Sequence, residues 1–285
     1  DHTVSGETFV IAECAGCSLR FTQDVPDAAS ISPYYKSEDY ISHSNTSKGL
    51  INRLYQSVRR RTLVKKRRLV QKVTGMGKGQ LLDVGSGTGA FVSEMSLNGW
   101  FVTGLEPDEG ARQVAKKEYN IELRDISHLF QLPAGSFDVI TLWHVLEHVH
   151  DLSPYVEQLK KLLKENGRLL IAVPNYTSKD AVIYKEHWAA YDVPRHLYHF
   201  SPQSMQVLME KHGLKILQYK PMWYDSFYIS MLSSKYKTGK TKLFSSFFNG
   251  FRSNLKAMAD VKRCSSVIYV ASPNPSQGGA LEPDR

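Results

Sequence analysis

Features that would mark a membrane or secreted protein are missing from this 285-residue sequence. No window approaches the ~20 apolar residues of a membrane-spanning helix, and the first residues lack the basic and apolar stretches of a secretory signal. Cysteine occurs only as Cys14, Cys17 and Cys264, too few for a disulfide framework. We therefore expect a cytoplasmic protein with one large domain and a small appendage. No initiating methionine is present, so we expect the chain to extend upstream of Asp1.

Acidic residues are absent from residues 47–73, which hold ten of the basic side chains. Because the net charge is +8, the remainder of the chain stands at −2. The ten are Lys48, Arg53, Arg59, Arg60, Arg61, Lys65, Lys66, Arg67, Arg68 and Lys72. No proline interrupts the range, so residues 47–74 are predicted to form one helix. We favour a packed helix with a solvated cationic face over weak contact with an anionic membrane. Nucleic acid is the least favoured partner, because no groove-reading motif accompanies the charge.

Residues 81–91 read LLDVGSGTGAF, which predicts a buried strand, a glycine-rich turn and the start of a helix. Gly85, Gly87 and Ala90 satisfy the dinucleotide pattern G-x-G-x-x-G/A, and Glu106 follows at about the spacing of a ribose-binding acid. Asp83 argues against a dinucleotide. A carboxylate two residues before the first glycine would repel a pyrophosphate, but it would suit a cationic amino-acid group.

Short apolar runs alternate with amphipathic segments along the rest of the chain, which predicts an α/β fold with a parallel sheet covered on both faces. The expected strands are residues 81–84, 101–106, 121–124, 137–143, 168–175, 214–220 and 266–271. Ligands on such sheets bind beyond the carboxyl ends of the strands. Polar or aromatic residues stand at five of those ends: Asp83, Glu106, Asp125, residues 143–148 and residues 175–176. These side chains are therefore expected to face one binding region.

The D-x-G-x-G-x-G run and the acid at the next strand end resemble class I S-adenosylmethionine (SAM) methyltransferases. Residues 143–148 (WHVLEH) and 187–200 resemble bacterial small-molecule methyltransferases related to the ubiquinone-biosynthesis O-methyltransferases. This similarity covers roughly residues 9–221. It implies a Rossmann-like seven-stranded sheet, six strands parallel and one antiparallel, with helices on both faces and a small N-terminal appendage. It also implies methyl transfer from SAM to oxygen or activated carbon of a small molecule.

The resemblance assigns the cofactor-binding residues. Glu106 would bind the ribose hydroxyls, Pro107 would pack against the adenine, Asp125 would read its amino group and Ile126 would lie beside the ring. Tyr40 would belong to an aromatic segment over the cofactor. The full set is Asp83, Gly85, Ser86, Gly87, Gly89, Glu106, Pro107, Asp125, Ile126, Trp143 and Tyr40.

A hydroxyl or acidic carbon must lose a proton during methyl transfer, and histidine is the usual base near neutral pH. The candidates for a catalytic base are His144, His148, His196 and His199, with Asp225 and Tyr224 on the insertion. For His144 the alternative is hydrogen bonding near the cofactor carboxylate or the substrate, and for His199 it is a structural imidazole. The run H-x-x-E-H also matches a zinc-peptidase pattern, but it straddles a strand end instead of lying on a helix. Related enzymes present Glu-x-x-Glu-His here and are thought to bind magnesium. His144 replaces the first glutamate, which puts magnesium in doubt.

Cys14 and Cys17 form a C-x-x-C turn, which is half of a tetrahedral zinc site. Two free thiols are the alternative. Several related methyltransferases carry an N-terminal zinc ribbon, so the resemblance implies a partner pair upstream of Asp1.

The expected organisation has four parts. An N-terminal segment (1–46) precedes the basic helix (47–77) and the methyltransferase domain (78–272), whose residues 222–262 form a helical insertion; a disordered tail (273–285) follows. Two other functions remain open: a SAM-binding regulatory protein without turnover, and a nucleic-acid methyltransferase. The second is disfavoured because Leu-Trp-His stands where the N/D-P-P-Y motif belongs. The sequence predicts neither the acceptor nor the oligomeric state.

Overall fold

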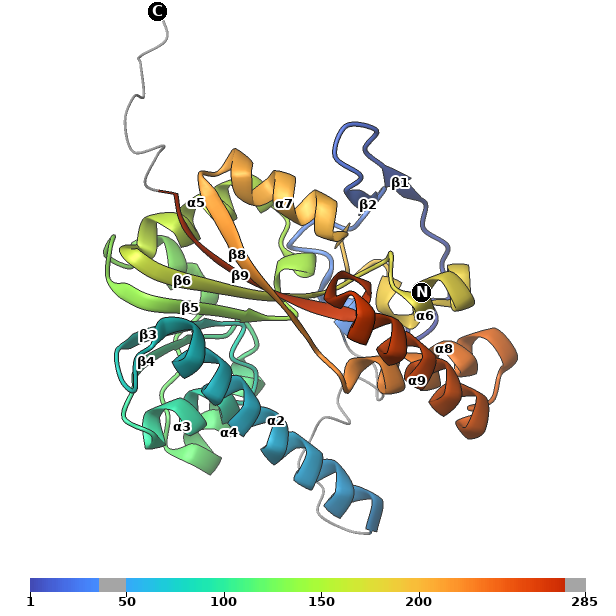
Figure 1. The fold of residues 1–285 in the computed structure, drawn as a ribbon, viewed down its shortest axis with the longest axis horizontal. Coiled ribbons are helices and arrows are strands. Elements are labelled where there is room, and N and C mark those ends of the chain that lie inside the picture. The colour runs from blue at the N-terminus through green and yellow to red at the C-terminus, as the bar shows by residue number, and fades with distance from the viewer. Residues whose placement is uncertain (36–49, 275–285) are drawn as a thin grey trace, which may run out of the picture.

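The computed structural model describes residues 1–35 and 50–274, and its centre is a twisted mixed sheet (Figure 1). Its strands run in the order β4-β3-β5-β6-β9-β8. They comprise Gln80–Val84 (β3), Phe101–Leu105 (β4), Phe137–Trp143 (β5), Leu163–Pro174 (β6), Leu214–Pro221 (β8) and Ser266–Pro273 (β9). Only β9 runs antiparallel to its neighbours β6 and β8. The α/β class and the antiparallel last strand are therefore confirmed.

The predicted count of seven strands, six of them parallel, is wrong for the described residues, where this sheet has six strands and five are parallel. Residues 121–124 make only the isolated bridge between Leu105 and Arg124. Two local features explain why residues 121–124 do not form a strand. Asn120 ends the helix Glu109–Tyr119 (α4) in a left-handed conformation, and Asp125 caps the 3₁₀ helix Ile126–Gln131 (η2) directly afterwards. Too little extended chain lies between these caps for a ladder.

The strands bury alternate side chains on the two faces of the sheet, as a period of two requires. One face packs on Leu50–Thr74 (α2) and Ala90–Leu97 (α3) through residues such as Leu81, Val139 and Leu170. The opposite face packs on Leu152–Leu162 (α5) and Pro202–Lys211 (α7) through Leu82 and Ile140. Both faces are covered, which leaves the carboxyl ends of the strands as the place for a ligand.

The N-terminal segment is joined to the large domain by a second, three-stranded sheet. Its strands are Ile11–Glu13 (β1), Arg20–Thr22 (β2) and Tyr198–His199 (β7), and β2 pairs antiparallel with β7. The Tyr176 hydroxyl also donates to the Ser18 carbonyl oxygen at 2.6 Å. Through β7, this segment holds the loop that carries His196.

The insertion forms a pair of packed helices, Asp225–Thr238 (α8) and Leu243–Ala259 (α9), beside the short helix Lys179–Tyr184 (α6) (Figure 1). Its expected helical character is confirmed. The predicted tail starts at residue 273, but Pro273 is still part of β9 and pairs with Leu214 of β8. Residues 275–285 lie outside the described part of the chain. No helix among the described residues is both long and apolar enough to span a bilayer.

Candidate functional site

The glycine-rich turn after β3 is fastened to the end of β4. The amides of Gly85 and Ser86 both donate to the Leu105 carbonyl oxygen, at 2.8 and 2.9 Å. Gly85 has φ 72°, and a Cβ there would lie 2.4 Å from a methyl carbon of Val145. Gly87 has φ 53° with no atom within 4 Å of the place a Cβ would take. Only glycine suits the first position, and the second presents bare backbone to open space where a ligand can approach.

Two buried acids, Asp83 and Glu106, flank this turn. Thr141 donates to Asp83 Oδ1 at 2.6 Å, and the amides of Gly87 and Asp108 donate to the two Glu106 oxygens at 2.7 and 3.0 Å. Burial raises the pKa of Asp83 to about 6, against the lowering effect of Thr141 and other partners. Burial also raises the pKa of Glu106, although both amides oppose it. A cationic ligand would relieve the cost of ionising both carboxylates in this setting.

Lys66 of α2 supplies a cation that the sequence pattern did not place in the site. Its Nζ lies 4.3 Å from the centre of the Trp143 ring. Burial lowers the pKa of Lys66 to about 8, while the charges of Asp83 and Asp225 act to raise it. Trp143 Nε1 is itself buried without a hydrogen-bond partner. An anionic group of a ligand would satisfy both the ammonium and this N–H.

These side chains fit the amino-acid end of SAM, which carries an ammonium and a carboxylate. Asp83 would attract the ammonium, and Lys66 with the Trp143 N–H would meet the carboxylate. The open face at Gly87 leaves room for the nucleoside beside Glu106, whose oxygens are already aimed by backbone amides. The donor set thus complements a zwitterion and not a diphosphate.

The residues expected around the adenine lie together at the edge of the sheet. Asp125 accepts from the Ser127 amide at 3.0 Å and forms an ion pair with Arg112 at 3.0 Å. The Ser127 hydrogen bonds, above all, lower the pKa of Asp125, so this carboxylate is ionised near neutral pH. Arg112 also donates to the Pro107 carbonyl oxygen at 2.8 Å, and Ile126 packs against the core. Arg112 therefore ties the ends of β4 and the 121–125 segment together, a role the sequence did not reveal.

His144 is held between two carboxylates. Its Nε2 lies 3.0 Å from Asp225 Oδ2 and its Nδ1 lies 3.2 Å from Glu147 Oε1. Burial lowers the pKa of His144, but the hydrogen bonds to Asp225 and Glu147 outweigh it and raise the pKa to about 10. Because carboxylate oxygens only accept, both ring nitrogens carry protons in this arrangement. His144 then has no lone pair with which to take a proton from a substrate.

His148 and His196 form a second imidazole pair, with ring centres 4.6 Å apart at 81°. Nδ1 of His148 lies 2.9 Å from the Arg195 carbonyl oxygen, and Nδ1 of His196 lies 2.9 Å from that of Ala190. These contacts assign the Nδ1 proton and leave Nε2 with the lone pair in the neutral ring. Burial and the nearby His196 lower the pKa of His148 to about 4, so His148 is neutral near pH 7.

Glu147, His148 and His196 are the group, within the described ranges, whose ligand atoms lie within 4.8 Å of one another. Oε2 of Glu147 is buried without a hydrogen-bond partner. This set fits magnesium poorly, because Mg²⁺ prefers oxygen ligands and two of the three donors are imidazoles. The replacement of a glutamate by His144 removes a further oxygen. The donor set therefore disfavours magnesium at this site.

Two further predictions concern residues away from this cluster. Cys14 and Cys17 sit on the turn between β1 and β2, with Cys14 exposed. Backbone hydrogen bonds from Cys17 and Gly16 lower the pKa of the Cys14 thiol, as in a metal-binding turn, but a second pair of ligands is not among the described residues near it. The zinc half site stays a prediction. Tyr40 lies outside the described residues.

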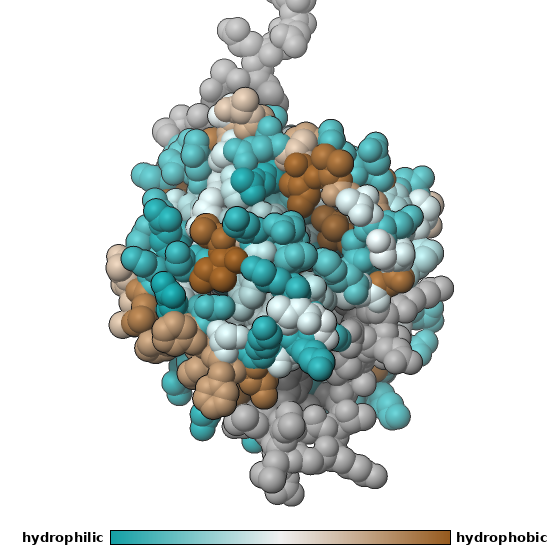
Figure 2. Space-filling model, turned by 90° about the vertical axis from the view of Figure 1, so that its right-hand side faces the viewer, coloured by the Kyte–Doolittle hydropathy of each residue, from teal (hydrophilic) through white to brown (hydrophobic). Residues whose placement is uncertain are grey.

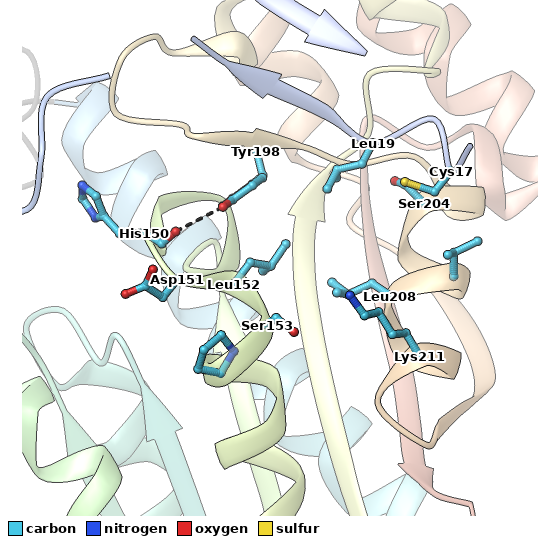
Figure 3. Close-up of a pocket in the computed structure, with 12 residues that line it drawn as sticks. Cys17, Leu19, His150, Asp151, Leu152, Ser153, Tyr198, Ser204, Leu208 and Lys211 are labelled. Atoms are coloured by element: carbon cyan, nitrogen blue, oxygen red, sulfur yellow. Dashed lines mark hydrogen bonds between the residues drawn. The ribbon is translucent and has the colours of Figure 1, made fainter. Parts of the chain in front are cut away.

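A cavity of about 390 Å³ opens elsewhere, between the start of α5, α7 and the N-terminal segment (Figure 3). Its lining includes Leu152, Leu208 and Cys17, and the Tyr198 hydroxyl donates to the His150 carbonyl oxygen at its rim at 3.1 Å. None of the expected catalytic or cofactor-binding residues lines it. We therefore place the functional site at the strand ends, where the charges converge, and not in this cavity.

The sheet order, the glycine turn and the charge pattern at the strand ends define a class I SAM-dependent methyltransferase. The chain belongs to a family described as a methyltransferase domain, whose model matches residues 55–219. SAM is accordingly its cofactor, and a small molecule is the methyl acceptor.

Relatives agree with this assignment, and solved structures share the fold. A ubiquinone biosynthesis O-methyltransferase from Nitrosococcus oceani is 30% identical over 175 residues, which cover 56% of this chain and 72% of the relative. One from Acinetobacter baylyi is 29% identical over 168 residues, covering 52% and 70%. The fold is shared with magnesium protoporphyrin IX methyltransferase from Synechocystis PCC 6803, solved with S-adenosylhomocysteine. That match has a TM-score of 0.56 at 13% identity and covers 87% of this chain and all of the other. A phosphoethanolamine N-methyltransferase from Haemonchus contortus, solved with SAM, gives 0.53 at 16% identity, covering 90% and 62%.

Proposed function

We propose that this enzyme methylates a hydroxyl oxygen, or an activated carbon, of a small molecule by base-assisted transfer. The observation that carries the proposal is the His148–His196 pair, in which the Nδ1 atoms lie against backbone carbonyl oxygens and burial keeps His148 neutral near pH 7. Relatives named as O-methyltransferases support oxygen as the first choice. An amine acceptor would also have to lose a proton. A hydroxyl, however, needs a base that removes its proton while the methyl group is being transferred.

The residues divide the work between cofactor and acceptor. SAM supplies an electrophilic methyl group on a sulfonium, and the chain must align an acceptor atom in line with it. Asp83, Glu106 and Lys66 hold and orient the cofactor. His148 accepts the proton of the acceptor hydroxyl through Nε2, and the charges of Glu147 and Asp192 stabilise the imidazolium that forms. The lone pair of His148 is free at neutral pH, as this step requires, although the lowered pKa makes His148 a weaker base than an exposed histidine.

In this proposal His144 is a positioning residue and not the base. It pairs with Asp225 at the first turn of α8 and with Glu147, so it fastens the insertion to the end of β5. Its backbone has φ 60°, an uncommon conformation for a residue other than glycine, which accompanies the sharp turn out of the strand. His144 would thus position Glu147 beside the imidazole pair.

Weak contact of α2 with an anionic membrane is a second proposal, less favoured than a packed helix with a solvated cationic face. Several cations in the described part of α2 are engaged within the protein: Arg67 pairs with Glu94 at 2.7 Å, Arg59 donates to Thr88 at 3.1 Å and Lys66 covers Trp143. These contacts favour the packed helix. A cytoplasmic location is likewise a proposal.

The test of the proposed function is an acceptor screen with a defined product. Purified protein is incubated with SAM carrying a ¹³C-methyl group and with two panels of acceptors, phenols and β-dicarbonyl carbon acids. Mass spectrometry measures S-adenosylhomocysteine, and the ¹³C shift distinguishes a methoxy from a C-methyl product. Methylated product that depends on His148 would support the proposal.

Two outcomes would contradict it. Tight SAM binding without S-adenosylhomocysteine formation from any acceptor of either panel would favour the regulatory alternative. Turnover on amines alone, unaffected by His148→Ala, would remove the base from the mechanism.

A further inference from the structure

Helix α9 has its apolar side chains on the outside. Leu243, Phe244, Phe247, Phe248, Phe251, Leu255 and Met258 are all exposed, and we call them the outer face of α9. Phe244 is 96% exposed, Met258 73% and Phe247 64%. Their spacing of three and four residues places them on one stripe of an α-helix. In a helix that only served the core, this stripe would point inward.

The opposite side of α9 is buried and consists of small residues: Ser246, Gly250, Ser253 and Ala257. A Cβ on Gly250 would lie 3.1 Å from the Phe227 backbone, so α8 and α9 pack closely there. Ser253 donates to Asp180 at 2.6 Å, which fixes the rotation of the helix. The outer face of α9 cannot turn inward without breaking this hydrogen bond and forcing large side chains into a tight contact.

Between Asp225, the first residue of α8, and Asp260, which follows α9, the charged side chains are all basic. Residues 226–259 contain six basic side chains and no acidic one. These are Lys235, Lys237, Lys240, Lys242, Arg252 and Lys256. Arg252 and Lys256 lie one helical turn apart, on the polar stripe next to the apolar one. Figure 2 views the side of the molecule on which α8 and α9 lie, and apolar side chains in brown and tan gather at its lower left edge.

We propose that the outer face of α9 docks onto an anionic lipid bilayer. A helix with bulky apolar residues on one stripe and basic residues beside it lies in the plane of the interface, with the apolar stripe buried among the headgroups and upper acyl chains. The phenylalanines supply apolar burial and the lysines and arginines meet lipid phosphates. This inference does not depend on the acceptor or on the base.

The basic side chains beside the outer face of α9 favour a lipid bilayer, and not a second copy of the chain, as the partner that covers this face. Two outer faces brought together would place basic segments without a compensating acid opposite each other, which is unfavourable. A bilayer rich in anionic headgroups offers the opposite charge over a broad area. The docking surface is also tied to the site, because Asp225, which begins α8, pairs with His144 at 3.0 Å.

The experiment is co-sedimentation of the full chain with vesicles of phosphatidylcholine alone and with vesicles that contain phosphatidylglycerol. We expect binding to the anionic vesicles, weaker binding to neutral ones and partial loss at high salt. Phe244→Ser with Phe248→Ser should lower partitioning at least about tenfold, since two apolar anchors are lost. Arg252→Glu with Lys256→Glu should abolish the preference for anionic lipid.

Phe101→Ser is the matched control, because Phe101 is 66% exposed but begins β4 at the opposite end from the strand-end site. It should bind vesicles like the unaltered protein. SAM binding and the melting temperature check that each variant is folded. Absence of binding to anionic vesicles would overturn the proposal, as would equal loss in the Phe101 control. A dimer in lipid-free sedimentation that the Phe244/Phe248 variant dissociates would assign the surface to a second copy instead.

Discussion

The cofactor side and the acceptor side of the site lie at neighbouring strand ends, but they are assembled in different ways. Asp83 and Glu106 are close in sequence, and amides or hydroxyls from the neighbouring strand ends hold them. On the acceptor side, His148, His196 and Asp225 come from three separate segments. The loop that carries His196 depends on β7 and the N-terminal segment for its place. A family can therefore keep the first half while changing the second with its substrate.

The two sides of the site also differ in how their charged groups are paired. The cofactor side places Asp83, whose pKa burial raises, near the buried Lys66 ammonium, an arrangement suited to a ligand that carries both charges. On the acceptor side the charged groups are already paired, because the His144 imidazolium lies between the carboxylates of Asp225 and Glu147. His148 on this side is left neutral. In the proposed function the first side binds the cofactor and the second moves a proton, and the following substitutions separate these two roles.

The largest effect is expected on the cofactor side. Asp83→Ala or Glu106→Ala should weaken SAM binding by about 10²–10⁴, because the first removes the carboxylate that faces the cationic amino-acid end and the second removes the acceptor for the ribose hydroxyls. Isothermal titration calorimetry measures the Kd. Asp138→Ala is the control: this acid caps the start of β3 through the Gln80 amide, away from the site. SAM affinity that stays unchanged in both acid variants would refute the site assignment.

On the acceptor side, His148→Ala should lower kcat by about 10²–10³ and leave the Kd for SAM unchanged, since a general base is lost without a cofactor contact. Initial rates of S-adenosylhomocysteine formation measure the effect. His150→Ala alters the same loop outside the imidazole pair and should keep near-normal turnover. A similar fall in both variants would show that loop disruption, not the base, is responsible.

A pH series distinguishes the two sides with a smaller effect. The pKa of Asp83 is raised to about 6, so its carboxylate is ionised above that pH and protonated below it. SAM affinity should be level above pH 7 and fall toward tenfold per pH unit below 6. Calorimetry of the unaltered protein and of Asp83→Asn from pH 5 to 7 tests this. The same slope in Asp83→Asn would assign the pH dependence to another group, with Glu106 the first alternative.

Removing or adding magnesium should leave turnover unchanged. The Glu147–His148–His196 set offers two imidazoles to an ion that prefers oxygen. Turnover after treatment with a chelator should match that before it, and added Mg²⁺ should not raise the rate. Loss of activity that Mg²⁺ alone restores would contradict this expectation and return the ion to the acceptor side.

Local patterns in the sequence predicted most of the sheet and the cofactor side. The ranges of β5 and β8 were predicted to within a residue, because apolar runs between turn signals mark buried strands. The strand predicted at residues 121–124 is wrong, and it shows what local patterns miss. The C-cap of α4 and the N-cap of η2 compete there with strand pairing at the edge of the sheet. Tyr40 and the tail beyond 274 lie outside the described residues.

The sequence by itself determined the glycine turn, Asp83 and Glu106, because they follow one another along a single strand-turn-helix-strand unit, from β3 through α3 to the end of β4. Only the tertiary structure brought Lys66 to Trp143, paired His144 with a residue 81 positions away and turned the phenylalanines of α9 outward. Periodicity shows that a helix has an apolar stripe. What covers that stripe, and which distant charge meets which, depends on contacts that no local pattern contains.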